Sequence, residues 1–283
     1  MDAYSPGDIA QRAETVGVAK AKQDFVSTFM LAILAGAFIG LGGCFFTTVV
    51  TETSLGYGPT RLLGGLAFSL GLILVIVAGA ELFTGNNLII MATISGKVSA
   101  ARLMHNWVVV YLGNLVGSLA TAALVYFACQ WKANNSAVGV TAYNIAGSKL
   151  ALPFATAFFA GVLCNALVCL AVWLCYSAGS TTDKILSIVF PITAFVALGF
   201  EHSVANMYFV PYGIMLAHTD EFVNGAATAG LLKFDPSIYT AGNFVVSNLL
   251  PVTLGNIVGG SLMVGVVYWI IYLRGGSRAV GDR

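Results

Sequence analysis

The sequence predicts an all-α membrane protein with six transmembrane helices in two inverted three-helix repeats. Of its 283 residues, 58% are hydrophobic and only 9% are charged, whereas about 25% are charged in soluble domains. The apolar residues gather in six blocks, each long enough for the roughly 20 residues that cross a bilayer core. Short motifs also recur in the same order in both halves of the chain. The net charge of +1 argues against a nucleic-acid partner.

The six blocks lie between a polar N-terminal segment, residues 1–24, and a C-terminal tail, residues 274–283. They span residues 25–50, 62–94, 106–129, 152–176, 185–217 and 244–273. Within the N-terminal segment, residues 16–19 form a small apolar patch that is consistent with an interfacial helix. We predict one transmembrane channel domain, residues 25–273, with repeats at about 25–130 and 150–273.

The second and fifth blocks are too long for one straight span, and each contains polar residues near its middle. In the fifth block these include Glu201, His202 and Asn206. An ionisable side chain in hydrocarbon costs about 2.5 to 3.5 kcal/mol on insertion scales, and irregular backbone at that depth must line a cavity or be covered by protein. We therefore predict that both helices are broken. A plainer alternative is that Glu201 and His202 only hydrogen-bond loose backbone ends.

The internal repeat rests on three matches between the halves. Residues 79–86 match 199–206 as Gly-x-Glu-x-x-x-small-Asn, residues 112–117 match 254–259, and Ala35-Gly36 matches Ala160-Gly161. Three crossings per half invert one repeat relative to the other, an arrangement that builds transport sites at the bilayer midplane. Because broken helices bring half-helix ends and their dipoles to one place, the matches predict a permeation pathway there.

The repeat also separates scaffold from function. Glu81 and Glu201 occupy equivalent positions, so we predict that both carboxylates, with Asn206, support the broken helices, the carboxylates by accepting unpaired backbone N–H groups. His202 has no equivalent histidine in the first repeat, where Leu82 occupies the corresponding position. A histidine present in one repeat only is harder to explain as scaffold, and it is the side chain suited to proton exchange near neutral pH.

The basic residues orient the protein. Most of them fall on one side of the predicted bundle: Arg12, Lys20, Lys22, Lys97, Arg102, Lys184, Arg274, Arg278 and Arg283. The other side holds Arg61, Lys132, Lys149 and Lys233. The positive-inside rule then predicts that both termini are cytoplasmic.

Three segments, residues 77–85, 161–171 and 199–207, resemble the formate–nitrite transporter family. The similarity covers about residues 22–273 and is nearest to the formate channels of that family. The resemblance implies an aquaporin-like six-helix fold in the bacterial inner membrane, and a homopentamer with a pore in every protomer. It implies formate as the permeant, with nitrite, hydrosulfide, acetate and lactate as related candidates.

The same resemblance implies roles for particular residues. His202 and Thr84 would face each other in a central chamber, with Asn165 and Asn256 lining the path. The constrictions would be Leu72, Leu82 and Val168 on the cytoplasmic side, and Phe68 and Phe195 on the periplasmic side. Composition alone favours ordinary core packing for these apolar residues.

Two further residues at family positions need separate comment. Lys149 matches a basic residue near the periplasmic mouth, and an interfacial lysine whose ammonium reaches the headgroups is the alternative. Glu81 stands where the enterobacterial formate channels carry Asp, which leaves both substrate preference and gating open.

These features favour a passive, pH-sensitive anion channel without a cofactor or metal. A proton-coupled symporter would use His202 in the same position, and a nitrite or hydrosulfide channel would share the framework. An enzyme is disfavoured, because the chain contains neither a His-Glu-x-x-His nor a Cys-x-x-Cys motif. Its five cysteines have no metal-type spacing.

Overall fold

The computed structural model describes residues 4–275, and every regular element in that range is helical. Six helical segments of this range are long and apolar enough to cross a membrane, which confirms the predicted number. They are α2 (Phe25–Val50), α3 with η1 (Tyr57–Gly79), α6 (Ala100–Phe127), α8 (Phe154–Ser177), α9 (Thr181–Leu198) and the continuous segment Ala241–Tyr272, which comprises α12, η5, α13, η6 and α14.

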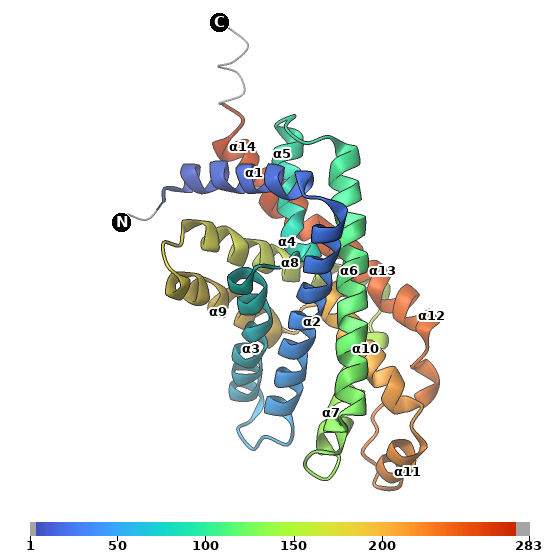
Figure 1. Cartoon of the computed structure of the whole chain (residues 1–283). Helices are drawn as coiled ribbons and strands as arrows, with labels where there is room; N and C mark the ends of the chain where they lie inside the picture. The colour runs from blue at the N-terminus through green and yellow to red at the C-terminus, as the bar shows by residue number, and fades with distance from the viewer. Residues whose placement is uncertain (1–3, 276–283) are drawn as a thin grey trace, which may run out of the picture.

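The two ends of the bundle carry different short helices. The N-terminal helix α1 (Pro6–Lys22) lies beside α14 (Val267–Tyr272) at one end, and α7 (Ala137–Leu150) and α11 (Asp220–Thr228) lie at the opposite end (Figure 1). We call these the terminal end and the distal end. Beyond Gly275, the predicted C-terminal tail lies outside the described residues.

Two of the spanning helices are broken, as the sequence predicts. The chain from α3 and η1 leaves helical conformation after Gly79 and re-enters it at α4 (Phe83–Asn86), which continues through η2 (Asn87–Ile89) into α5 (Ile90–Ile94). Helix α9 ends before Gly199, and α10 (Ser203–Ala217) begins four residues later. Gly79 and Gly199 have φ of 82° and 76°, a backbone conformation that glycine adopts without steric cost. Both breaks therefore occur at a glycine.

Helix α1 packs one face on the protein, and the interfacial helix considered for residues 16–19 stays a prediction. Ile9, Ala10 and Ala13 form a buried cluster with Met91 and Trp173. Gly17 is also buried, and a Cβ there would touch Ile89 and Ala92 at 3.4 Å. The next helix, α2, begins at Asp24, whose carboxylate accepts the Ser27 N–H at 2.9 Å. This backbone hydrogen bond lowers the pKa of Asp24 below its ordinary value.

Helices α1 and α7 extend the repeat beyond the boundaries predicted from sequence. Each is a short helix directly before the first spanning helix of its half, α1 before α2 and α7 before α8. Lys20 of α1 lies four residues before the N-cap Asp24, and Lys149 of α7 lies four residues before the N-cap Pro153. The two repeats therefore comprise α1 to α6 and α7 to α14.

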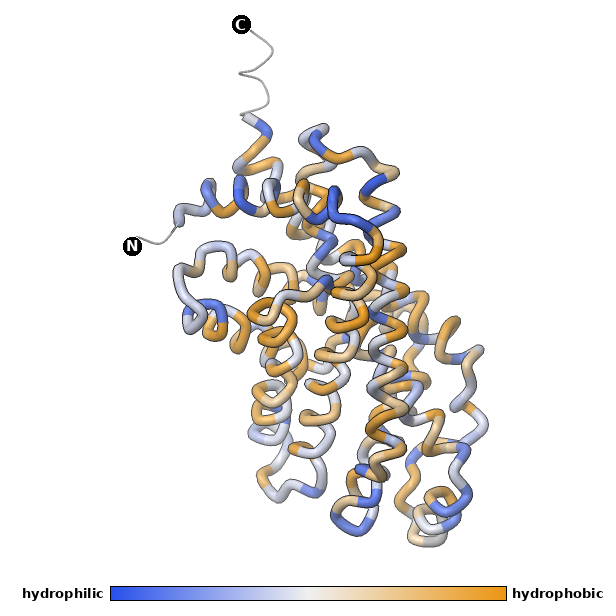
Figure 2. Tube along the Cα trace, viewed as in Figure 1, coloured by the Kyte–Doolittle hydropathy of each residue, from blue (hydrophilic) through white to orange (hydrophobic). Residues whose placement is uncertain are grey.

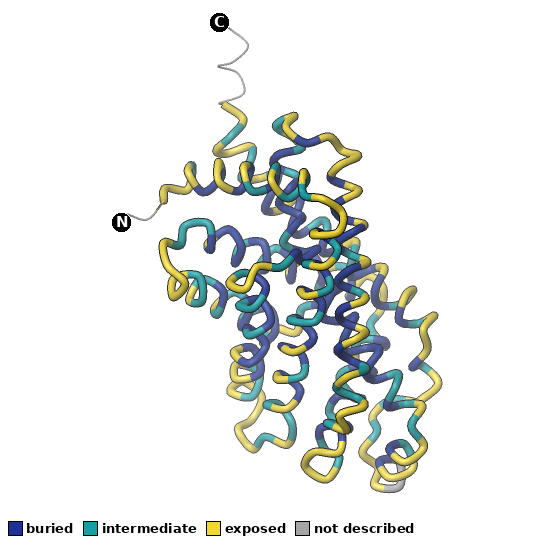
Figure 3. Tube along the Cα trace, viewed as in Figure 1, coloured by how far each residue is buried: buried dark blue, intermediate teal, exposed yellow. Residues whose placement is uncertain are grey.

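The outer surface of the bundle suits a lipid environment. Hydrophobic residues follow the long helices and hydrophilic ones gather toward the ends (Figure 2). The six membrane-spanning helices carry exposed as well as buried positions (Figure 3). Inside, the helices cross closely at glycines. A Cβ at Gly117 would collide with the Ile33 carbonyl, and one at Gly259 with the Val162 carbonyl. Small residues at such crossings are typical of helix packing in membranes.

Candidate functional site

The two helix breaks meet at a pair of polar side chains. Thr84 lies in α4, directly after the first break, and His202 is the N-cap residue of α10, directly after the second. Thr84 Oγ1 lies 3.1 Å from His202 Nε2, and both side chains are buried. The structure thus places the two residues face to face, from segments that are 118 positions apart in the sequence.

The other ring nitrogen of His202 has a backbone partner. Nδ1 accepts the N–H of Ala205 at 3.0 Å and so caps α10. An imidazole nitrogen that accepts carries no proton, so the proton of the neutral ring lies on Nε2. Nε2–H then donates to the Thr84 hydroxyl, whose own O–H is left to donate to a third group.

On the distal side of this pair lie two aromatic rings. The rings of Phe68 and Phe195 meet edge to face with centroids 5.6 Å apart, and the Phe195 ring stacks on His202 at 5.9 Å. Beyond them is a cavity of about 160 Å³, the distal cavity, which Arg61, Lys149 and Glu201 also line. Phe68, Phe195 and His202 all belong to the lining, so the distal cavity reaches the imidazole of the central pair as well as the two rings.

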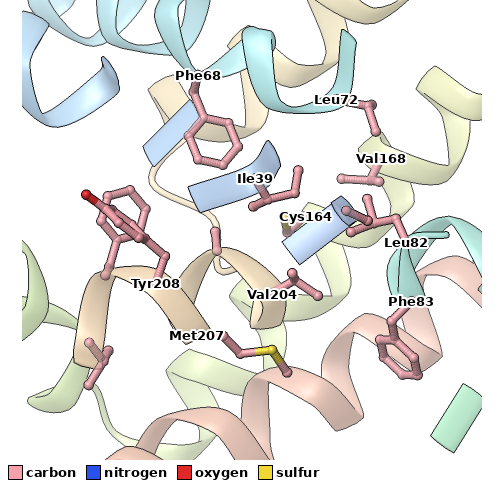
Figure 4. Packing of buried hydrophobic residues seen from close by; sticks show 14 of the residues in the cluster. Ile39, Phe68, Leu72, Leu82, Phe83, Cys164, Val168, Val204, Met207 and Tyr208 are labelled. Carbon is pink, nitrogen blue, oxygen red and sulfur yellow. The ribbon is translucent and has the colours of Figure 1, made fainter. Parts of the chain in front are cut away.

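Three aliphatic side chains lie on the terminal side of the pair. Leu72, Leu82 and Val168 gather in one part of the core, apart from Phe68 (Figure 4), and all three are buried. Leu72 and Leu82 also line a second cavity of about 620 Å³, the terminal cavity. Phe68 and Phe195 thus line the distal cavity, and Leu72 and Leu82 line the terminal cavity. Their role as constrictions stays a prediction.

At each cavity, a lysine and a glutamate of the wall belong to a cluster that also contains two asparagines. In the terminal cluster, Lys20 Nζ lies 2.7 Å from Glu81 Oε1, Asn86 Nδ2 donates to Glu81 Oε2 at 2.7 Å, and Asn86 also donates to Asn106 Oδ1 at 3.0 Å. Asn106 in turn donates to the Lys20 carbonyl at 3.3 Å.

The distal cluster repeats these four contacts. Lys149 Nζ lies 2.8 Å from Glu201 Oε1, Asn206 donates to Glu201 Oε2 at 2.7 Å, and Asn206 donates to Asn248 Oδ1 at 2.7 Å. Asn248 donates to the Lys149 carbonyl at 3.1 Å. Lys149 therefore points inward to a buried carboxylate, and not toward the membrane interface.

We expected Glu81 and Glu201 to accept backbone N–H groups, but their hydrogen-bond donors are side chains. The carboxylates bind the side chains just described, and asparagines meet the backbone at each break. Asn114 accepts the Phe83 N–H at 2.9 Å and donates to the carbonyls of Ala32 and Glu81. Asn256 accepts the Ser203 N–H at 2.9 Å and donates to the carbonyls of Gly161 and Glu201. An amide suits this position because it both donates and accepts.

These bonds also correct one match of the sequence repeat. Asn114 and Asn256 are equivalent, and their carbonyl partners on α2 and α8 are Ala32 and Gly161. The pairing of Ala35-Gly36 with Ala160-Gly161 is therefore shifted by about one helical turn. If Ala32 is equivalent to Gly161, then the residue of the first repeat that is equivalent to Asn165 is Gly36.

Asn165 is buried at the centre and binds several groups at once. Its Nδ2 donates to the carbonyls of Thr84 and Asn256, at 3.3 and 2.7 Å, and to Asn87 Oδ1 at 3.0 Å. Asn165 and Asn256 thus connect α8 and α13 (Leu250–Ile257) to the two breaks. Their predicted place along the path stays a prediction.

Sequence reasoning missed four members of these clusters and one cation. Lys20, Asn86, Asn106 and Asn248 complete the two clusters, and Arg61 lines the distal cavity. Asn86 was visible in the matched motif as the counterpart of Asn206. Lys20 could have been found from its distance to the start of α2, because Lys149 lies at the same distance before α8.

Comparison with known proteins identifies relatives along nearly the whole chain. A family model described as formate/nitrite transporter matches residues 7–270. The formate channel FocA of Escherichia coli (strain K12) is 43% identical over 277 residues, covering 97% of this chain and 96% of that protein. FocA of Haemophilus influenzae is 43% identical over 267 residues, covering 93% of each protein.

Solved structures agree in fold. A pentameric formate channel with formate bound has a TM-score of 0.80 and 45% identity, covering 88% of this chain and 98% of that chain. An ion channel of the FNT family has a TM-score of 0.78 and 29% identity, covering 93% and 98%.

Proposed function

The chain belongs to the formate/nitrite transporter family, and on that premise we propose that it is a passive, pH-sensitive channel for formate and similar small monovalent anions. The observation that carries this proposal is the Thr84–His202 pair, which has apolar residues on both sides and a basic cavity toward each end. The role is transport, not catalysis.

The two cavities favour anions. Arg12, Lys20 and Lys184 line the terminal cavity beside one carboxylate, Glu81. The distal cavity has two cations, Arg61 and Lys149, beside Glu201. An excess of positive charge in a recess with low-dielectric walls raises the local concentration of anions.

The central pair suits a small ion with one charge. A bare anion between Leu and Phe side chains is expensive, so its passage needs donors that replace part of its water shell. Thr84 supplies a hydroxyl that His202 already orients, and the imidazole supplies a second donor when it turns from Thr84 to the anion. One hydroxyl and one imidazole cannot neutralise a divalent or phosphorylated ligand.

Proton exchange with the anion is the finer part of the proposal. To release a proton from Nε2 and stay neutral, the ring must already carry one on Nδ1. That proton would face the Ala205 N–H, which now donates to Nδ1, so the first turn of α10 must loosen when His202 is charged. We propose that this coupling makes the flux sensitive to pH.

For assembly and location, we propose a homopentamer in the bacterial inner membrane with both termini in the cytoplasm. The structural relative at 45% identity is a pentameric channel, which supports the assembly. The distribution of basic residues supports the orientation. A native mass spectrum in mild detergent with only monomer or tetramer would contradict the pentamer.

Two alternatives share the same residues. A proton-coupled symporter would use His202 once per anion, and a channel for nitrite or hydrosulfide would use the same central pair. Flux through purified protein in liposomes distinguishes them, with formate, nitrite, hydrosulfide, acetate and lactate each measured across pH, and sulfate and succinate as divalent comparisons. We expect formate to pass fastest and without obligatory proton coupling. Rapid sulfate or succinate flux with formate excluded would overturn the proposal.

A further inference from the structure

Arg61 lies in the wall of the distal cavity, outside the Lys–Glu–Asn cluster of that cavity. It belongs to the second turn of α3, and its Nε donates to the carbonyl of Ala197 at 3.0 Å. A second nitrogen donates to the carbonyl of Val196. Both carbonyls belong to the last turn of α9, where a cation is favoured by the helix dipole. A guanidinium has five N–H donors, so three are left after these two bonds.

The charge of Arg61 is the excess charge of this cavity. Three charged side chains line it, and two of them, Lys149 and Glu201, form an ion pair at 2.8 Å. Arg61 is bonded to neutral carbonyls, so its full positive charge stays uncompensated among the lining residues. A planar guanidinium also matches the two oxygens of a small carboxylate.

The position of Arg61 on α3 connects it to the first constriction. Phe68 follows seven residues later, which is two helical turns on the same face and about 10 Å along the helix axis. Leu72 follows one further turn along the same face. One of the two carbonyls that bind Arg61 belongs to Val196, which directly follows Phe195. Arg61 thus lies at the outer end of the α3 face that leads to Phe68 and then Leu72.

We propose that Arg61 is an anion-binding residue of the distal cavity, which holds a small monovalent anion before it passes Phe68 and Phe195. This inference rests on the proposed channel function. It assigns Arg61 a role in entry from one side only, because the terminal cavity has its own cations.

The test compares Arg61→Gln and Arg61→Lys in sealed vesicles of both orientations. For entry from the distal side, we expect Arg61→Gln to raise the half-saturating formate concentration about tenfold, at the low end of electrostatic focusing effects, and to weaken its dependence on ionic strength. Half-saturation from the terminal side should not change. Arg61→Lys should stay near the wild type, because it keeps the charge.

A larger loss of flux in Arg61→Lys than the wild-type-like behaviour expected above would assign Arg61 a purely structural role. If it only holds the end of α9, Arg61→Lys would lose maximal flux in both directions, and half-saturation would not shift from one side alone. Lys233→Gln is the control for surface charge, since Lys233 is a lysine of the distal loop outside the cavity lining. An unchanged distal half-saturation in Arg61→Gln would overturn the proposal.

A second readout separates this inference from the channel function. Line broadening of isotope-labelled formate by purified protein requires binding but no passage. If the wild type conducts no formate, the proposed function fails, whereas weaker broadening in Arg61→Gln than in Arg61→Lys would still support the site. Equal broadening in the wild type and Arg61→Gln would count against it.

Discussion

Nε2 of His202 lies 3.1 Å from Oγ1 of Thr84, and this contact joins the two helix breaks of the protein. The histidine is fixed from behind, because its Nδ1 accepts the Ala205 N–H. Its chemistry toward the anion is therefore coupled to the start of α10. This arrangement has no counterpart in the first repeat, where Leu82 occupies the equivalent position.

The first prediction concerns His202→Asn. Asparagine is a good N-cap residue, so the variant should fold, cap α10 and form the same oligomer. Its amide cannot take up a proton, so we expect formate flux between about pH 5 and about pH 8 to lose the pH dependence that the imidazole supplies. Flux is measured in liposomes that contain equal amounts of assembled protein. His218→Asn, at a histidine outside both cavities, is the control. If His202→Asn kept the wild-type pH profile, His202 would be a neutral donor and the proton exchange would be rejected.

The second prediction concerns the Lys149–Glu201 pair. Their side chains are 14% and 6% exposed, and removing one member of a buried ion pair costs about 3 to 5 kcal/mol because the other charge is left alone. Glu201→Gln and Lys149→Met should each lower thermal stability and the yield of assembled protein. The double variant should be more stable than either single one. The Lys132–Glu221 pair, with side chains 45% and 68% exposed, offers a control whose loss should hardly matter. Additive losses in the Lys149→Met/Glu201→Gln double variant would show that the two charges do not stabilise each other.

Much of this architecture was predictable from the sequence, for physical reasons. The membrane-spanning segments can be predicted because crossing a bilayer requires about 20 apolar residues. The helix breaks can be predicted because Glu and His side chains are energetically costly at that depth. The hydrogen bonds of the Asn114 side-chain amide were not predictable, since its partners lie 82, 33 and 31 positions away in the sequence. The match of Ala35-Gly36 failed because small residues recur on almost every turn of α2, so a shift of one turn leaves the pattern similar.

The third prediction concerns Asn256, which holds the second break together. Leucine has a similar volume but no polar atoms, so Asn256→Leu leaves the Ser203 N–H and the carbonyls of Gly161 and Glu201 without this partner. Each buried unsatisfied group costs about 1 to 3 kcal/mol, so we expect a loss of roughly 3 kcal/mol or more. The measurement is thermal unfolding of the detergent-solubilised protein.

Asn144 supplies the matched control for this variant. It also makes two bonds to backbone, with Leu231 and Lys233 at 3.2 and 3.0 Å, but these bonds are exposed, so water replaces them. Asn144→Leu should therefore be nearly as stable as the wild type. Equal stability of Asn256→Leu and Asn144→Leu would show that Asn256 is not needed at the break.

The fourth prediction concerns the width of the distal constriction. The Phe195 ring contacts both Phe68 and His202, so a smaller side chain at this position widens the passage next to the histidine. Phe195→Leu should raise the flux of lactate relative to formate several-fold, because the larger anion is limited more by the ring than formate is. The measurement is the lactate-to-formate flux ratio in liposomes. Phe190→Leu is the control, since Phe190 lies on the same helix and is 75% exposed. A ratio that rises equally in both variants, or in neither, would mean that Phe195 does not limit the size of the permeant and is a core residue only.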